Sequence, residues 1–307
     1  MSMDRTPALG QRGTENFLAG LIRRTMNNIL TTLQPALSWR PGKRDAAELF
    51  LIAIALPLYY LVRGVAHARV DQAMDRGMDL VRLEQKLGIF WETDLQRLII
   101  DHDFLVSFFN NLYLYGHLPV IGVLALWLYL WHRPQYLLMR NAFLLSGAIG
   151  LVFYVMFPTA PPRMLPAEFG FVDTVLHEYS ESRPLTPSFF VNEYAAMPSL
   201  HMGWNLLVGI AVWLATKNIF MRSFAVVMPV AMLATIILTA NHYIVDAVAG
   251  VGVMFLGMFI ALSAREMVRQ YHRRNGNRRP SALHGWLYWL CGLPDTEQQR
   301  TPRGTSA

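Results

Sequence analysis

The sequence predicts an all-α membrane protein, a six-transmembrane-helix bundle with flanking interfacial amphipathic helices. The prediction rests on composition and on the length of the apolar segments. Of the 307 residues, 53% are hydrophobic and 16% are charged, whereas soluble domains usually have about 25% charged residues. The mean hydropathy is +0.28. Six segments are long or apolar enough to cross a hydrocarbon core of about 30 Å, which takes roughly 20 helical residues.

These segments divide the chain into three regions. Residues 1–45 form a basic tail, residues 46–263 form the membrane domain, and residues 264–307 form a second basic tail with an interfacial segment. Pro57 and Pro119 fall within the first two predicted spans, where each predicts a kink because proline frees a backbone carbonyl. The six predicted spans are 46–66, 113–131, 141–157, 203–219, 223–240 and 243–263.

The distribution of basic residues predicts the orientation. Of the 27 Lys and Arg residues, 19 lie in the two tails and in the loops after the second and fourth spans. The two long loops on the other side, 67–112 and 158–202, hold seven together. The positive-inside rule then predicts that both termini are cytoplasmic. We expect a multi-pass protein of the plasma (inner) membrane. We expect no signal peptide, because the first apolar run starts late and no small-residue cleavage site follows it.

Three further segments have an amphipathic or interfacial character. Residues 18–33 show helical spacing of apolar side chains beside arginines, which predicts a helix on the anionic inner leaflet or packed on the membrane domain. On the outer side, residues 89–108 predict one or two helices that pack on the bundle or line an entry for lipid. Residues 283–293 contain Trp and Tyr side chains, as interface anchors do. Residues 294–307 are expected to be disordered.

Composition also excludes several classes of protein. Cys291 is the single cysteine, which excludes an intrachain disulfide framework and a metal centre built on sulfur. The formal net charge of +6 and the pI of about 9.6 would suit nucleic acid, but the basic residues follow the predicted cytoplasmic segments. Phosphate-binding loops, nucleotide fingerprints and internal repeats are absent from the sequence. We expect no cofactor, no metal and no nucleic-acid partner, and a membrane bilayer as the environment.

Three polar clusters fall at the predicted outer ends of the spans. They are residues 157–163 after the third span, residues 197–201 before the fourth, and residues 242–246 between the fifth and sixth. The topology, which was inferred without them, places all three at one depth near the extracytoplasmic face. Ionisable groups in membrane segments are costly and mark functional sites. The clusters therefore predict one shared site.

The third and second clusters each contain a histidine. His242 and Asp246 are four residues apart, which places both on one face of a helix. A carboxylate beside one imidazole nitrogen fixes the tautomer and raises the basicity of the other nitrogen, as a base or nucleophile requires. His201 would supply a second acid or base. Taken singly, each residue could be a structural polar group; together, two histidines at one face indicate catalysis.

The remaining groups suit an anion. Arg163 offers a planar cation that matches phosphate oxygens, although a single arginine at an interface often only snorkels to the headgroups. Pro198 could occupy the first position of the fourth helix. Free backbone N–H groups near Ser199 would then point at the anion. The combined residue types suit phosphoryl transfer.

The pattern as a whole resembles the type 2 phosphatidate phosphatase superfamily over roughly residues 140–263. The sequence PTAPP at residues 158–162, the sequence MPSLH at 197–201 and the pair His242-Tyr243 look most like the branch of the inositol phosphorylceramide synthases and their bacterial relatives. The matching motifs are Arg163, P-S-x-H at residues 198–201 and H-x3-D at residues 242–246.

The resemblance implies a role for each residue. His242 would attack phosphorus and form a phosphohistidine, and Asp246 would orient it and balance its charge. His201 would protonate the leaving alkoxide. Arg163, Ser199 and backbone amides would bind the phosphoryl oxygens as charge develops on them.

The chain departs from the family pattern in ways that affect its charge. Two of three expected cations are missing. Either other residues of loop 158–202, such as Arg183 or His177, meet the phosphoryl charge, or the substrate is a diester with a single negative charge. The departures are Met156 for lysine, Met164 for proline, Leu200 for glycine and Ile236 for arginine.

Three functions remain open from the sequence. The first is a metal-independent phosphotransferase that moves a phospho-headgroup from a phospholipid donor to a lipid alcohol, like inositol phosphorylceramide synthase. The second is a phosphatase of lipid phosphates or polyprenyl diphosphates, with water as the acceptor. The third is a lipid transporter or scramblase, which would need polar residues along several spans; the ionisable groups here stop near the outer end.

Overall fold

The structure is a computed structural model, and its described residues are helical, with no strand and a single isolated β-bridge between Thr159 and Ala195. An all-α fold is therefore confirmed for this part of the chain. Of the helix predicted at 18–33, the structure describes only Arg23, Arg24 and Asn27, which are helical, and the disorder predicted at 294–307 lies outside the described residues. The described residues are Arg23, Arg24, Asn27, 42–65, 69–174, 194–275, Trp286, 288–291 and Leu293.

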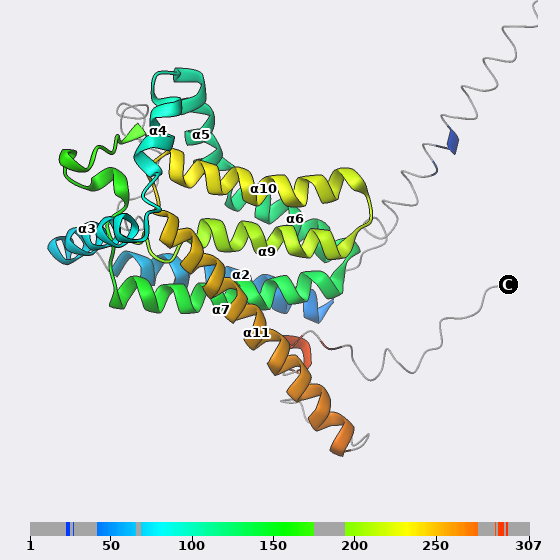
Figure 1. The fold of residues 1–307 in the computed structure, drawn as a ribbon. Helices are drawn as coiled ribbons and strands as arrows, with labels where there is room; N and C mark the ends of the chain where they lie inside the picture. The colour runs from blue at the N-terminus through cyan, green and yellow to red at the C-terminus, as the bar shows by residue number, and fades with distance from the viewer. Residues whose placement is uncertain are drawn as a thin grey trace, which may run out of the picture. The chain divides into compact units, whose positions relative to one another are not determined.

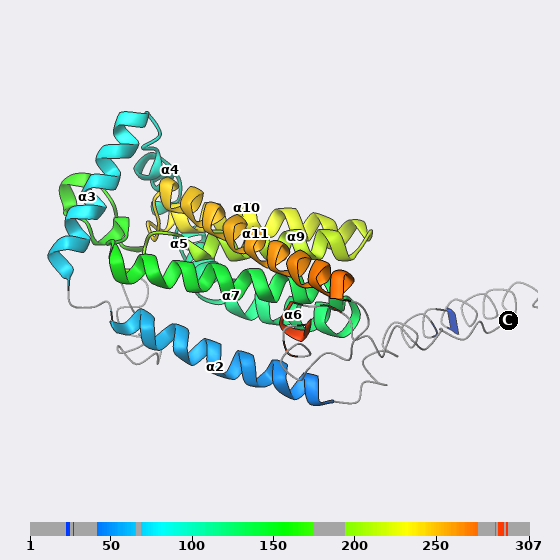
Figure 2. The same ribbon diagram turned by 90° about the horizontal axis from the view of Figure 1, so that it is seen from below.

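The described residues from Lys43 onward form one compact unit, in which α9 is the central helix. It contacts α6, α7, α10 and α11, and α2 lies alongside α7 (Figures 1 and 2). Shorter helices gather at the end of the bundle where α7 ends. The long helices are α2 (Lys43–Val65), α6 (Leu118–Trp131), α7 (Arg133–Met156), α9 (Leu200–Ala215), α10 (Ile219–Leu238) and α11 (Ile244–Asn275). The shorter ones are α3 (Val70–Leu87), α4 (Glu92–Ile100), α5 (Asp103–Tyr115), η2 (Pro162–Met164) and η3 (Ala167–Phe169).

Three of the described helices are long and apolar enough to cross a membrane: α7, α10 and the Ile244–Tyr271 part of α11. Helices α5 and α6 would add a fourth span if the bent pair is counted as one. Helix α9 has 16 residues, or about 24 Å of rise, which is shorter than a hydrocarbon core of about 30 Å. The prediction of six spans is therefore not confirmed.

The second predicted span is a broken one. A bend of 49° separates α5 from α6, and Pro119 lies in the first turn of α6 instead of kinking a continuous helix. The predicted bend in this span is present, but it is a break between two helices and not a kink within one, because proline in a first turn removes no intrahelical hydrogen bond. The one or two helices predicted within 89–108 are α4 and the first part of α5, whereas α3 was not predicted.

Close backbone approach fixes the spacing of α9 and α11. A Cβ atom on Gly250 would overlap the carbonyl oxygen of Ser199, and one on Gly203 would lie 2.6 Å from the carbonyl oxygen of Gly250. Only glycine permits this contact. Trp204 anchors the other side of α9, where its indole Nε1 donates to Ser146 Oγ of α7 (3.1 Å).

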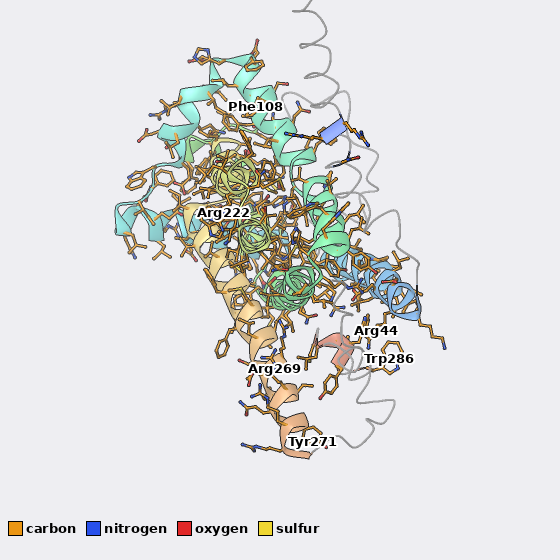
Figure 3. The ribbon with its side chains drawn as sticks, turned by 90° about the vertical axis from the view of Figure 1, so that its right-hand side faces the viewer. Arg44, Phe108, Arg222, Arg269, Tyr271 and Trp286 are labelled. Atoms are coloured by element: carbon orange, nitrogen blue, oxygen red, sulfur yellow. The ribbon has the colours of Figure 1, made fainter. Side chains whose placement is uncertain are left out.

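The opposite end of the bundle is joined by a buried ion pair. Arg140 Nη1 of α7 lies 2.5 Å from Glu48 Oε1 of α2, and Arg140 Nη2 donates to the carbonyl of Leu290 (2.8 Å). Trp289 is buried against this guanidinium, while Trp286 is 55% exposed. Figure 3 views the bundle from this end and labels Trp286 and Arg44. The predicted C-terminal anchor is thus partly packed on α7.

Candidate active site

The three polar clusters meet at one end of the bundle, where α7 and α10 end and α9 and α11 begin (Figure 1). Arg163 Nη1 donates to Asn241 Oδ1 (2.6 Å). The Ser199 amide donates to the carbonyl of Asp246 (3.0 Å). The structure thereby brings all five predicted site residues together, and His201 and His242 face each other directly.

The four-residue spacing of His242 and Asp246 predicts that both lie on one helix. In the structure, His242 lies instead in the turn before α11. Ala240 has a left-handed backbone (φ 51°), the conformation that commonly ends a helix. The carbonyl of Ile236 then accepts from the amides of both Asn241 and His242, each at 3.0 Å. This turn holds His242 at 4% exposure, and helix α11 begins at Ile244.

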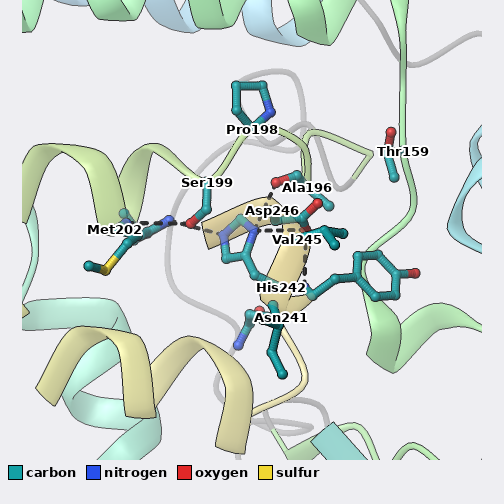
Figure 4. A network of polar contacts seen from close by, with 12 residues as sticks. Thr159, Ala196, Pro198, Ser199, Met202, Asn241, His242, Val245 and Asp246 are labelled. Carbon is teal, nitrogen blue, oxygen red and sulfur yellow. Dashed lines mark hydrogen bonds and ion pairs between the residues drawn. The ribbon is translucent and has the colours of Figure 1, made fainter. Parts of the chain in front are cut away.

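The hydrogen bonds of His242 define its tautomer. Its Nδ1 lies 2.8 Å from the carbonyl oxygen of Ala196 (Figure 4). A carbonyl only accepts, so Nδ1 carries the proton and Nε2 carries the lone pair. The Asp246 Oδ2 atom lies 3.4 Å from the same Nδ1 and accepts from the Tyr243 amide (3.1 Å). The main-chain carbonyl, and not the predicted carboxylate, is the nearer partner.

His201 faces the lone pair of His242. Its Nδ1 lies 3.4 Å from His242 Nε2. The His201 ring lies against Tyr113 and His117, with ring centroids 4.6 Å and 4.3 Å away. These contacts restrain the orientation of the imidazole.

His117 is a third histidine at the site that the sequence analysis missed. It lies in the break between α5 and α6 and is 6% exposed. Asn205 Nδ2 lies 2.7 Å from His117 Nδ1 and donates to the carbonyl of His201 (2.7 Å). The signal that identified the other two histidines, an ionisable side chain at the outer end of an apolar segment, also applied to His117.

Ser199 is the N-cap of α9. Its Oγ accepts from the amide of Met202 (3.4 Å), and its own amide donates to the carbonyl of Asp246 (3.0 Å). The Ser199 amide is therefore already used, and an anion site at this cap would depend on the next amides of α9. Pro198 precedes the cap and is not the first helical residue. The hydroxyl hydrogen of Ser199 is not used in the capping bond.

Arg163 is held against the His242 turn by two partners. Besides Asn241, its Nε lies 3.6 Å from Asp173 Oδ2, and the side chains are 17% and 26% exposed. Asn241 is itself oriented by a bond from its Nδ2 to Thr239 Oγ1 (2.7 Å). A phosphate at this guanidinium would compete with Asp173.

The positions that lack the family cations do not contribute to the site. Met156 is 56% exposed at the end of α7, and Ile236 is buried among apolar side chains. Two nearby arginines donate hydrogen bonds to carbonyls at the end of α7. Arg69 donates to the carbonyl of Val155, and Arg76 donates to the carbonyl of Met156. Cations suit a helix C-terminus. The other two candidate cations, at positions 177 and 183, lie outside the described residues.

The described residues include no group of three or more His, Cys, Asp and Glu side chains that could hold a metal. The arrangement offers two facing imidazoles, His242 and His201, and the guanidinium of Arg163. These are the groups that a covalent phosphoryl transfer uses.

Comparison with known families agrees with this chemistry. A model of the PAP2 superfamily matches residues 78–260, more than half of the chain, and the match includes all five predicted site residues. Neither the comparison with curated proteins nor that with solved structures gives a match, and the inositol phosphorylceramide synthase branch is not singled out. Members of the superfamily are in general phosphatases or phosphotransferases, which suggests activity on lipid phosphates. The chain belongs to the PAP2 superfamily.

Proposed function

We propose that the protein is a metal-independent lipid phosphotransferase that moves a phospho-headgroup from a phospholipid to a lipid alcohol through a phosphohistidine on His242. The observation that carries the proposal is the pairing of His242 Nε2 with His201 Nδ1 at 3.4 Å. The opposite nitrogen of His242 is held by a carbonyl at 2.8 Å. A nucleophilic nitrogen whose ring is oriented through its other nitrogen, with a second acid or base within reach, is the arrangement that nucleophilic catalysis uses.

In the first step, His242 Nε2 forms a bond to phosphorus while the bond from phosphorus to the leaving oxygen breaks. The leaving oxygen takes the electron pair of that bond, and protonated His201 supplies its proton. The phosphorylated imidazole keeps its proton on Nδ1, which continues to donate a hydrogen bond to the Ala196 carbonyl. Asp246, 3.4 Å from Nδ1, balances the positive charge on the ring.

The second step reverses the roles. Neutral His201 accepts a proton from the hydroxyl of the acceptor, whose oxygen attacks phosphorus and releases His242. A lipid alcohol as acceptor gives headgroup transfer, whereas water gives phosphatase activity. Both reactions use the same residues, so the acceptor that reaches the phosphohistidine decides between them.

The charge of the site favours a diester substrate. Arg163 is the cation on the His242 turn, and the carboxylate of Asp173 partly balances it at 3.6 Å. The positions of two further family cations carry Met156 and Ile236 instead. A phosphodiester has one negative charge and a phosphomonoester nearly two, so the single guanidinium on the His242 turn among the described residues suits the diester better. This supports transfer of a headgroup over hydrolysis of a monoester.

The proposed location is near the extracytoplasmic face, with cytoplasmic termini in the plasma membrane. The end of the bundle opposite to the site carries basic side chains, which supports this orientation under the positive-inside rule. In the described part of the chain they include Arg44, Arg133, Arg140, Lys217 and Arg222.

The test is incubation of purified protein in lipid vesicles with a panel of phospholipids, with and without ceramide or diacylglycerol, in the presence of EDTA. Mass spectrometry would follow the products, with His242→Ala as the control. Headgroup transfer to the added alcohol is expected. Release of free phosphate or a free phospho-headgroup alone would assign the phosphatase or hydrolase alternative. Turnover that only a divalent ion restores would overturn the metal-independent mechanism.

A further inference from the structure

Two glutamates from outside the catalytic clusters reach the start of α11. Glu84 of α3 accepts a hydrogen bond from the Val245 amide on its Oε1 (2.8 Å). Glu92 of α4 accepts one from the Ile244 amide on its Oε1 (2.9 Å). Both side chains are completely buried. The first amides of a helix have no intrahelical partner, and here two acidic side chains satisfy them.

The second oxygen of each glutamate gives the protonation state of the pair. Glu84 Oε2 and Glu92 Oε2 are buried, and neither has a hydrogen-bond partner. The two carboxyl groups accept from the amides of consecutive residues, Val245 and Ile244, which places them side by side at the start of α11. Ionised carboxylates only accept, so a bond between them requires that one carries a proton. A single shared proton would satisfy both oxygens.

The surroundings favour that proton. The other titratable groups that face the pair are Tyr243 and Asp246, and His242 lies beyond Asp246. Among the described residues, neither glutamate forms an ion pair with a Lys, Arg or His side chain. Burial, together with the hydrogen bond to Glu92, raises the pKa of Glu84 to about 9. One proton is therefore retained at neutral pH, as in other carboxyl pairs that share a site.

The pair acts on the same short turn that carries the catalytic residues. The amides of Tyr243, Ile244 and Val245 donate in succession to the carboxyl groups of Asp246, Glu92 and Glu84. The hydroxyl of Tyr243 also donates to the carbonyl of Ala160 (2.9 Å). Three carboxyl groups thus fix the entry of α11, and with it the distance between Asp246 and His242.

We propose that Glu84 and Glu92 share one proton and act together as positioning residues for the His242–Asp246 turn. Helices α3 and α4 are then part of the support of the active site. The catalytic consequence rests on the proposed function, whereas the shared proton does not.

Replacement by glutamine tests the shared proton. In Glu84→Gln or Glu92→Gln, the amide oxygen can still accept from the backbone and the NH₂ group can donate to the remaining carboxylate. In the double variant, two NH₂ groups face each other and no acceptor remains between them. We expect each single variant to keep the wild-type Tm and kcat within about threefold. The double variant should lose about 10²-fold in kcat, the scale of a small misplacement of catalytic groups.

The pH dependence gives a second measurement. A carboxyl group whose pKa is raised on folding stabilises the folded state at low pH, and this stabilisation is lost as pH rises from the ordinary value near 4.5 to about 9. The Tm of the wild type should therefore fall over this range. In the Glu84→Gln variant, Tm should fall less over the same range, because the glutamine amide does not titrate. Glu168→Gln, an exposed glutamate, is the matched control and should behave as the wild type.

The outcomes separate the two proposals. Single variants as damaged as the double variant, or a double variant equal to the wild type, would overturn the shared proton. An unchanged pH dependence of Tm in Glu84→Gln would do the same, and this measurement stands even if the double variant does not fold. If the wild type transfers no headgroup, the Tm measurements still decide on the pair, and only the proposed function fails.

Discussion

The guanidinium of Arg163 lies 3.6 Å from the carboxylate of Asp173, and the same guanidinium donates to Asn241 beside His242. The ion pair is partly exposed, so it contributes little to stability, on the order of 0–1 kcal/mol. An anionic substrate bound at Arg163, as we propose, would compete with Asp173 for this cation. We therefore expect Asp173 to affect substrate binding more than it affects the fold.

Replacement of Asp173 by Asn should lower KM. Loss of the competing carboxylate leaves Arg163 with more of its charge for the phosphoryl oxygens. An ion pair that contributes up to about 1 kcal/mol corresponds to a decrease in KM of up to about fivefold. The change in kcat should be smaller. Steady-state kinetics on vesicles of fixed composition would measure both. Glu168→Asn serves as a control for a general change of surface charge, and a higher KM in Asp173→Asn would contradict the assignment.

The two histidines should differ in how they depend on the leaving group. His242→Ala should abolish the acid-labile phosphoenzyme on every substrate. His201→Ala should slow the reaction of a lipid by about 10²–10⁴-fold, the usual contribution of general acid catalysis. The deficit should shrink for a nitrophenyl phosphodiester, because its leaving group needs no proton.

The measurement is turnover of both variants on the lipid and on the nitrophenyl ester, with trapping of the phosphoenzyme. A phosphoenzyme that survives in His242→Ala and disappears in His201→Ala on the activated ester would reverse the two roles. Asp246→Asn should weaken turnover while the protein remains folded, since an amide cannot balance the charge of the imidazolium.

Gly250→Ala should destabilise the protein because the added methyl group would overlap the carbonyl of Ser199. Overpacking of this kind costs about 1–3 kcal/mol, or a fall in Tm of about 2–4 °C per kcal/mol for a domain of 150–250 residues. Gly252→Ala is the matched control on the same helix, since nothing lies within 4 Å of its added Cβ. Thermal unfolding in detergent would compare them, and equal Tm values would refute the tight contact.

Modification of Cys291 should leave turnover intact. Cys291 lies near Arg140, at the end of α7 opposite to the site. Arg140 and the end of α7 at Met156 are 16 residues apart, about 24 Å of helix. Burial raises the pKa of the Cys291 thiol, so labelling by a maleimide should be slow at pH 7 and faster at higher pH. Cys291→Ala is the control for modification at other residues. Inactivation that this variant prevents would place the site elsewhere.

The site could be predicted to a considerable extent, because its parts lie at the ends of apolar segments whose order the sequence reveals. Arg163, Ser199 and His201 come together with the His242 turn for this reason. The geometry of the turn could not be predicted. Four-residue spacing favours a helix, but the left-handed Ala240 ends α10 and leaves His242 in front of α11.

Glu84 and Glu92 escaped prediction for a different reason. Their partners are backbone amides at residues 244 and 245, far away in the sequence, and a backbone partner leaves no pattern of residue types. Among the acidic residues between 71 and 103, nothing local distinguishes the two buried ones. Likewise, Pro119 is compatible with both a kinked helix and the start of a new helix. The bend between α5 and α6 in the structure shows that a new helix starts there.

The acceptor for the Nδ1 proton of His242 is a main-chain oxygen, that of Ala196. Any amino acid at position 196 would provide the same atom, so alanine scanning would pass over it without effect. The tautomer of His242 is thus encoded in the path of the backbone from Tyr194 to Ser199, which is hydrogen-bonded to Thr159. An engineer who wished to retune that proton would have to reshape the loop or replace a peptide bond by an ester.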